Sequence, residues 1–501
     1  MDTFNTFPGN MDKADKKAIA SEIYGNRFHA DQTLYEYLIE FLLIFVSDDN
    51  DKDNPKERMR FHNPNATGKL HYTVEPRIGL KRFIFFDKNK KNDAINIDRI
   101  AYQEIMSALK NKVEGCDDEE KTELLEAIQD LFHGYAVVLK KRSWCAQAML
   151  PLCPEVVFCE AMPKSKVRHA LVWDLTADEI ERAKVDTEFD FNKHNFLARG
   201  GELYYLHLLQ GLQGKEDKRG KLEYLLREQI ETQGKKMSSM ASFIQKTWEE
   251  HMGYEGPLKQ QLHLSFIPES AYKNIASDSV DELINFMSCR MHPVQKIELL
   301  AKGVMIQVMR MLSVATTNYL GTERDCWIMD MGGVTNGIVK RIASNSFSEV
   351  RNTFTTAIGR NLKSDDGKEK IKIINKARKD SFDIFKQKGK ELRCIIPTSG
   401  PFERFSMPED GVRFLVLALI GPGQKMTFDM FLEKLYEKYR IVVGPAQYKK
   451  MQGDGDISLA NSFEENGKSF QEFLKATGFL TELSDATSIV INPYEQMKGE
   501  G

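Results

Sequence analysis

The sequence predicts a mostly helical α+β protein of several domains that ends in a winged-helix domain. Its 501 residues suffice for two to four domains, and a hydrophobic content of 42% supports sizeable cores. The last ninety residues follow the order helix, helix, helix, β-hairpin, which is the winged-helix plan. The expected parts are an N-terminal α+β domain (1–166), a helical domain (167–315), a basic α/β segment (316–400) and the winged-helix domain (401–501).

The N-terminal part alternates predicted helices with short strand-like runs. Residues 31–46 predict a strongly apolar helix with Asp31 as its N-cap. The runs 69–74 and 81–86 are short and rich in β-branched or aromatic residues, which is typical of strands. Further elements are expected as helices at 98–109 and 121–132 and as a strand at 134–139.

The stretch 142–166 is dense in cysteine and proline. Cys145, Cys153 and Cys159 are spaced by eight and six residues with no nearby His, which is not the spacing of a zinc site. We therefore expect a helix, a proline break and a buried extended segment at 156–159, with no metal.

The region 176–313 is helical in pattern almost throughout. Pro293 stands at the start of a long helix, where proline is tolerated. The buried stripe of that helix is expected to be Leu299, Leu300, Val304, Val308 and Met311. His207 lies in an apolar run and is expected to be a core residue rather than a ligand or a base.

Asp330 and the glycines after it form the one motif with the character of a phosphate loop. An Asp at a strand end followed by Gly332 and Gly333 resembles the first phosphate loop of the sugar-kinase and actin-like ATPases, where the Asp holds a metal. In those families the motif opens the domain, whereas here it follows about 325 residues, and no second loop follows it. A strand–turn–strand segment is the better expectation.

The segment from Lys340 to Arg393 is the most basic part of the chain, with fifteen Lys or Arg against seven Asp or Glu. Its second half predicts one long helix that buries Ile371, Ile374 and Phe382 and exposes its cations. Either this is a solvated surface helix or it contacts nucleic-acid phosphates, independently of base sequence. The candidate contacts are Lys368, Lys370, Lys372, Lys376, Arg378, Lys379, Lys386 and Lys388.

The predicted winged helix has a composition that favours protein docking over DNA reading. Apolar residues at helical spacing define its second helix, which Thr427 would cap, and Gly478 fits the end of the third. Residues 411–495 hold nine Lys or Arg against eleven Asp or Glu, and the hairpin has no cation. A major-groove reader normally presents several cations or amides on its third helix. Lys468 and Lys475 are the candidates for DNA contact there.

Composition also limits the function classes. A net charge of −3 gives no global attraction to nucleic acid or membrane, and seven cysteines without C-x-x-C pairs fit a reducing cytoplasm. The most apolar runs are shorter than the roughly 20 residues of a membrane span, and no signal peptide is evident. P-loop, nucleophile-elbow and zinc patterns are absent, and E-x-K matches such as Glu119-Glu120-Lys121 lie in acidic linkers or helices and not on the strand pair of a PD-(D/E)xK nuclease. We therefore expect no cofactor and a non-enzymatic protein.

Three stretches carry a family resemblance: RSWCAQAMLPLCPEVVFCEA, the amphipathic middle, and the tail from LVLALI to SIVINPY. Together they resemble accessory proteins of multi-gene bacterial phage-defence clusters, which typically accompany a HerA/FtsK-like ATPase, as in phosphorothioation-dependent restriction systems. The resemblance implies a cytoplasmic bacterial protein that works with protein subunits on DNA. It carries over no catalytic residue.

The first hypothesis is therefore a non-catalytic subunit of a DNA-directed complex in antiviral defence. One alternative is an enzyme, either a divergent metal-dependent nuclease or an ATPase using Asp330, which would place a metal or nucleotide in a pocket. The other is a winged-helix transcription regulator, which would bind one operator far more tightly than bulk DNA.

Overall fold

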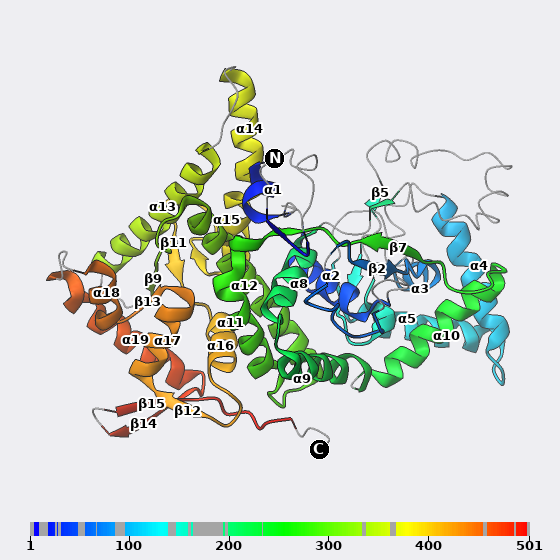
Figure 1. Cartoon of the computed structure of the whole chain (residues 1–501). Helices are drawn as coiled ribbons and strands as arrows, with labels where there is room; N and C mark the ends of the chain where they lie inside the picture. The colour runs from blue at the N-terminus through cyan, green and yellow to red at the C-terminus, as the bar shows by residue number, and fades with distance from the viewer. Residues whose placement is uncertain are drawn as a thin grey trace.

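The computed structural model is mostly helical with several small sheets, which confirms the predicted α+β class (Figure 1). It describes residues 5–9, 19–25, 28, 32–48, 56–66, 68–85, 96–138, 147–158, 162–163, 194–195, 199–232, 234–332, 337–360, 367–453, 458–484 and 487–497. The helices of residues 34–251 occupy one side of Figure 1 and most elements after residue 325 the other, with α11 (Glu269–Met287) and α12 (Pro293–Leu320) between them.

The centre of the molecule is a group of long apolar helices. It comprises α2 (Leu34–Val46), α8 (Gly200–Gly211), α11 (Glu269–Met287) and α12 (Pro293–Leu320), with α9 (Glu216–Arg227) packed on α11. Pro293 opens α12 as predicted, and all five residues of its expected stripe are buried. The prediction that Asp31 caps α2 is wrong. Thr33 does so, in a capping box with Glu36 that satisfies backbone N–H groups at the helix start.

A second core lies farther from the centre. Around it pack α3 (Ile78–Phe85), α4 (Asn96–Lys112), α5 (Asp118–His133) and α10 (Lys235–His251). The prediction of a strand at 81–86 is wrong, since most of this run lies in α3. An added Cβ at Gly79 would come within 2.2 Å of the Trp248 ring, so the close contact between α3 and α10 needs a glycine there.

Short antiparallel pairs join the periphery to these helices. They are β1 (Thr6–Phe7) with β8 (Ile267–Pro268), β2 (His71–Val74) with β7 (Gln260–His263), β3 (Ala136–Val138) with β4 (Ala148–Met149), and β5 (Met162–Pro163) with β6 (His194–Asn195). The strands expected at 69–74 and 134–139 are confirmed as β2 and β3. Of the buried extended segment expected at 156–159, Val156 ends a 3₁₀ helix (Pro154–Val156), and Val157 and Phe158 are buried outside any helix or strand. Cys159 lies outside the described residues.

A mixed sheet anchors the basic segment. Its strand order is β10 (Ile395–Ile396), β11 (Arg404–Ser406), β9 (Trp327–Asp330) and β13 (Ile441–Val442), with β11, β9 and β13 parallel. Strands from both sides of the predicted boundary at residue 400 therefore share one sheet. The expectation of strand–turn–strand after Asp330 is wrong, because α13 (Gly337–Gly359) begins there and packs on β9 and β11.

The C-terminal part consists of helices and a small antiparallel sheet. Its helices are α16 (Glu409–Leu419), α17 (Phe428–Tyr439), α18 (Pro445–Gln452) and α19 (Ser462–Ala476). The sheet has the order β12 (Lys425–Thr427), β15 (Thr487–Ile491) and β14 (Leu480–Ser484). Thr427 caps α17, and Gly478 follows α19 with a φ of +79°, both as predicted.

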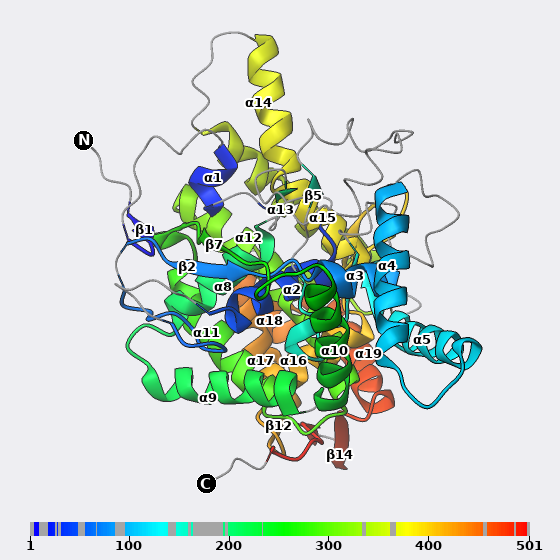
Figure 2. The same ribbon diagram turned by 90° about the vertical axis from the view of Figure 1, so that its right-hand side faces the viewer.

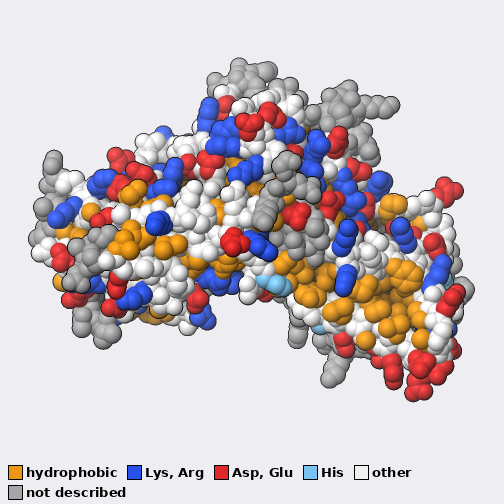
Figure 3. Space-filling view, turned by 90° about the horizontal axis from the view of Figure 1, so that it is seen from below, with side chains coloured by type: hydrophobic (Ala, Val, Ile, Leu, Met, Phe, Trp, Pro, Cys, Tyr) orange, Lys and Arg blue, Asp and Glu red, His pale blue; other side chains and the backbone are white. Residues whose placement is uncertain are grey.

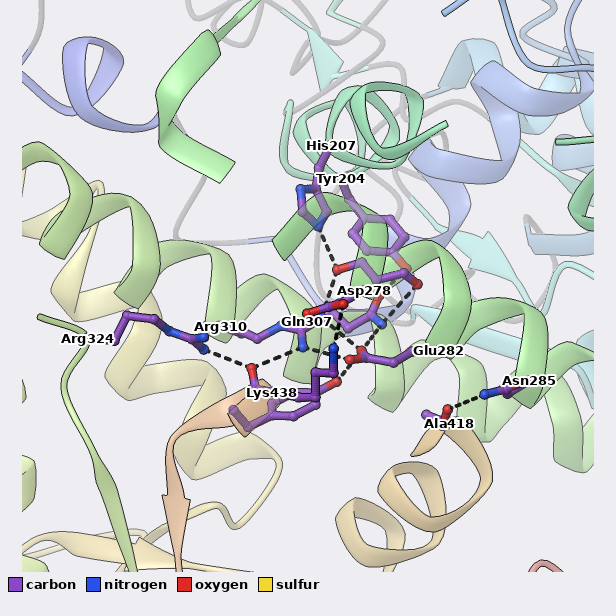
Figure 4. Close-up of polar contacts among 12 residues, drawn as sticks. Tyr204, His207, Asp278, Glu282, Asn285, Gln307, Arg310, Arg324, Ala418 and Lys438 are labelled. Atoms are coloured by element: carbon purple, nitrogen blue, oxygen red, sulfur yellow. Dashed lines mark hydrogen bonds and ion pairs between the residues drawn. The ribbon is translucent and has the colours of Figure 1, made fainter. Parts of the chain in front are cut away.

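A buried polar network holds this C-terminal part on the central helices (Figure 4). The Arg310 guanidinium of α12 donates two 2.8 Å hydrogen bonds to the two carboxylate oxygens of Glu282 on α11. Tyr439 of α17 donates a 2.6 Å bond to the same carboxylate, and its ring lies 4.1 Å from the guanidinium carbon. Because a buried charge is tolerated only when it is paired, these three residues fix α17 against α11 and α12.

His207 joins the edge of this network. It is fully buried and its Nε2 lies 2.7 Å from the hydroxyl of Ser279, in agreement with the prediction of a core residue. Burial, and then the charge of Arg310, lowers the pKa of His207 to about 3. The imidazole is therefore neutral at physiological pH and has a structural role.

Within the described residues, α12 is the one helix whose length and composition would allow it to cross a membrane. Of its most apolar window, 94% is buried inside the protein.

Candidate nucleic-acid interface

The basic segment folds as two helices, where the sequence predicted one. They are α14 (Gly367–Lys379) and α15 (Phe382–Glu391), and the chain turns between them at Ser381. Ser381 is buried, and its hydroxyl donates a hydrogen bond to the carbonyl of Ala377. The turn lets α15 bury Phe382 and Phe385 in the core, while α14 projects from the body in both Figures 1 and 2.

The outer face of α14 carries a stripe of lysines. Lys368, Lys372, Lys376 and Lys379 are spaced by four, four and three residues, which places them on one side of an α-helix over about 16 Å. All four are exposed. Ala377 is the buried residue on the opposite side, which packs toward α13 and α15. We call these four residues the lysine stripe.

Few anions oppose these cations. Among the described residues, no carboxylate pairs with Lys372, Lys376 or Lys379, and Lys370 at the outer end of the helix is likewise exposed and without an ion pair. Arg378 lies off the stripe and approaches Asp383 at 3.4 Å. The stripe therefore presents positive charge to solvent at small desolvation cost.

The predicted contacts on α15 are placed differently. The prediction that Lys388 is exposed is wrong, because it is 1% exposed and bonds Glu391 at 2.9 Å. Lys386 lies 2.6 Å from Glu403, which also pairs with Lys390. Although burial opposes it, these two ammonium groups hold the pKa of Glu403 below its usual value. The α15 lysines thus bind carboxylates of this chain.

The solvent side of α13 carries further cations, which the sequence pattern had not indicated as a candidate site. Its exposed polar residues are mainly cations, hydroxyls and amides, with Glu349 as their one acid. They are Lys340, Arg341, Asn345, Arg351, Asn352, Thr355 and Thr356. Cations and amides of this kind are usual donors to phosphate oxygens. The hydroxyls of Thr355 and Thr356 already donate to the carbonyls of Arg351 and Asn352. A helix wheel over the whole of 337–359 could have found this face, since Val339, Ala343, Val350 and Phe354 share the buried side.

The two candidates on α19 lie apart from this surface. Lys468 is exposed beside Glu464 and Glu465, and Lys475 pairs with Glu482 of β14 at 2.7 Å. Asn466 of the same helix is buried and bonds backbone atoms at the ends of β9 and β13. The face of α19 therefore has mixed charge. The tip of the hairpin at 485–486 lies outside the described residues.

Asp330 is occupied within the fold. One of its carboxylate oxygens accepts a 2.6 Å hydrogen bond from Arg404, and the other accepts a 3.0 Å bond from the N–H of Gly332. Asp330 is only 3% exposed, so this ion pair is a buried link between β9 and β11. Gly333, the second glycine of the motif, lies outside the described residues.

No cluster of three or more His, Cys, Asp or Glu among the described residues has the geometry of a metal site. Of the three cysteines in the 142–166 stretch, Cys145 and Cys159 fall outside the described residues. Burial raises the pKa of the third, Cys153, to about 12, so its thiol stays protonated and is a poor nucleophile.

Comparison of this chain with protein-family models, with curated proteins and with solved structures gave no significant match.

Proposed function

We propose that this protein is a non-catalytic subunit of a DNA-directed complex and that it contacts nucleic-acid phosphates through α13 and α14. The observation that carries this proposal is the lysine stripe on a helix that projects from the body (Figure 2). Phosphate backbones are bound through clustered cations of this kind, with little dependence on base sequence. The neutral donors of α13 would add hydrogen bonds beside the ionic contacts.

We further propose that the C-terminal part is a winged-helix module. The order α16, β12, α17, α19, β14, β15 supports this, as does the pairing of β12 with β15 and of β15 with β14. The segment β13–α18 is then an insertion between the second and third helices, and β13 joins the mixed sheet through β9. Since Lys475 is paired and glutamates flank Lys468, this module would dock a protein rather than read bases.

The resemblance to accessory proteins of phage-defence clusters supports the wider setting of the proposal. In that setting the complex belongs to a restriction system in the bacterial cytoplasm. A HerA/FtsK-like ATPase would supply the motor activity, since this sequence contains no P-loop motif. The projecting α14 would then hold the complex on DNA while the partner acts.

The alternatives have less support. An ATPase that held a metal through Asp330 would have to break its ion pair with Arg404 first. An operator-specific regulator would need base-reading donors on α19, where the exposed face is mixed in charge.

The test is a fluorescence-anisotropy titration of the full chain with a labelled duplex and a labelled single strand of several sequences, at two salt concentrations. Binding that weakens with salt and is similar for all sequences is the expected result. Absence of binding at low salt would refute the phosphate contact. Tight binding to one duplex alone would favour the regulator instead.

A further inference from the structure

A pocket beside the central helices contains a buried lysine. The pocket has a volume of about 450 Å³, which is within the usual range of ligand sites. It lies between the end of α9, the connection from α11 to α12, and the C-terminal segment. The residues that line it are Glu228, Gln229, Arg290, Met291, Lys296, Glu495, Gln496 and Met497. In Figure 1 α9 and the C-terminus lie on the lower side, and Figure 3 shows this side with charges of both signs and hydrophobic side chains gathered towards one end.

The backbone around this pocket is fixed by the fold. Glu228–Thr232 is a π-helical turn that continues α9, and such turns are rare and frequently found at functional sites. The C-terminal segment is held on the connection from α11 to α12. There the N–H of Arg290 donates to the carbonyl of Glu495 at 2.8 Å, and the N–H of Met497 donates to the carbonyl of Ser288 at the same distance. The pocket is therefore built by segments that are far apart in the sequence.

The contacts of Lys296 fit a neutral amine. Its side chain is only 1% exposed, and its Nζ donates to the carbonyl oxygen of Met287 and to the thioether sulfur of Met497, each at 3.1 Å. Because Met497 lines the pocket, the amine lies at the pocket wall. An ammonium group would bring three hydrogens to these two acceptors, of which the sulfur is weak. A neutral amine has two hydrogens and keeps its lone pair free.

Burial also favours the neutral amine. It lowers the pKa of Lys296 from 10.5 to about 8, although the charges of Cys289 and Glu228 oppose this change. At pH 8 about half of the Lys296 side chains are therefore unprotonated, whereas an ordinary lysine would be about 0.3% unprotonated. Lysines whose pKa is lowered in this way react as nucleophiles with carbonyl groups.

The charges around the pocket favour an uncharged ligand. Glu228 and Glu495 bring two negative charges, and Arg290 brings one positive charge that lies 3.1 Å from Glu495. With the amine neutral, negative charge is in excess and disfavours an anion. The carboxylates and the exposed amide of Gln496 can form hydrogen bonds with ligand hydroxyl groups.

We infer that this pocket holds a small uncharged hydroxy-aldehyde and binds it as an imine on Lys296. The lone pair of Nζ adds to the carbonyl carbon. The two amine hydrogens then leave with the carbonyl oxygen as water, so the step needs neither an oxidant nor a reductant. Hydrolysis reverses it and releases the aldehyde. The inference does not depend on nucleic-acid binding.

The test is reductive labelling of the full chain with glycolaldehyde at pH 8, in which sodium cyanoborohydride converts each imine to a stable secondary amine. Peptide mass spectrometry gives the labelling rate of each lysine. Lys296 should be labelled at least tenfold faster than Lys273, an exposed lysine of α11 outside the pocket. K296M should lose the fast site, whereas the matched control K273M should keep it, with circular dichroism confirming that both variants are folded.

A second probe tests the class of ligand. Glyoxylate is an aldehyde of similar size that carries a carboxylate. The ratio of Lys296 labelling to Lys273 labelling cancels the different intrinsic reactivities of the two aldehydes. This ratio should be at least fivefold lower with glyoxylate than with glycolaldehyde.

Three outcomes would overturn the inference. If Lys296 stays unlabelled in the folded chain and reacts only after unfolding in urea, it is a structural residue closed to ligands. If it is labelled no faster than Lys273, the pocket does not activate its amine. Equal labelling ratios for the two aldehydes would overturn the assignment of an uncharged ligand.

Discussion

The sharpest prediction concerns the lysine stripe. Replacing Lys372, Lys376 and Lys379 by Gln removes three exposed cations that have no ion pair with any described residue. Gln has nearly the helix propensity of Lys, so α14 should stay helical. Any change in nucleic-acid affinity then reports the lost charges rather than a lost helix.

The expected magnitude follows from counterion release. Each phosphate neutralised on a duplex contributes about 0.9 to the slope of log K against log salt concentration, so three lost contacts should reduce that slope by about 2.7. Between 50 and 200 mM salt, the wild type should therefore lose about 40-fold more affinity than the variant loses. On a single strand the reduction should be smaller, at about 2.1.

The assay is fluorescence anisotropy at four or more salt concentrations. Its control is K221Q/K235Q/K236Q, which changes the net charge equally at exposed lysines of α9 and α10. The control should reproduce the wild-type slope. If the stripe variant also keeps the wild-type slope, α14 does not contact phosphates. If the control flattens the slope as much as the stripe variant does, binding reflects overall charge and not α14.

The remaining predictions concern the free energy of unfolding, which is measured by urea denaturation. Glu282→Gln leaves the Arg310 charge buried without its partner and should cost about 3–5 kcal/mol. E282L/R310M should recover only part of that loss, because the buried donors of Tyr439 and Gln307 lose their acceptor; an unchanged E282Q midpoint would contradict the network. Phe431 is fully buried in α17, so F431A should cost about 3–5 kcal/mol, and a loss below about 1 kcal/mol would contradict its packing. Burial lowers the pKa of Lys296 from 10.5 to about 8. Between pH 8 and pH 10.5 the unfolded chain therefore keeps a proton on Lys296 that the folded protein has released. The free energy of unfolding should rise by about 3 kcal/mol as the pH rises through this range. Lys296→Met should abolish that gain and be the more stable protein below pH 8; parallel pH profiles for the two proteins would refute this.

The elements that could be predicted are those with a long hydrophobic period. Both α12 and α17 show one, and their expected core residues are buried. The run at 81–86 is too short to distinguish a helix from a strand by pattern, and its packing against Trp248 decides in favour of a helix. The prediction of a strand at the start of α13 was wrong because the phosphate-loop motif covers too few residues. The helical period of buried residues becomes visible only when the pattern is followed to Phe354.

The candidate site was predictable in composition but not in shape. Counting charges identifies the lysine stripe, but it gives Lys388 the same expected exposure as the stripe lysines. Lys388 is buried because Phe382 and Phe385 pack α15 into the core, where its ammonium group pairs with Glu391. The separation of Lys388 from the stripe depends on the turn at Ser381, whose hydroxyl bonds the carbonyl of Ala377 four residues earlier. The burial of Phe382 and Phe385 beyond the turn is a tertiary feature that the sequence pattern does not predict.

The mixed sheet joins the helices of the proposed nucleic-acid contact to the C-terminal module that is proposed to dock a partner. β9 lies between β11 and β13, and α13, which packs against α14, follows directly after β9. On the other side, Asn466 of α19 donates to the backbone carbonyls of Met329 and Val443, and so ties α19 to the same strands. A partner docked on the C-terminal module would therefore be held at a fixed distance from nucleic acid bound along α14. Because Asn466 is buried, replacing it by Leu would loosen this link without touching either surface, so N466L should leave each single binding event intact while weakening any coupling between them.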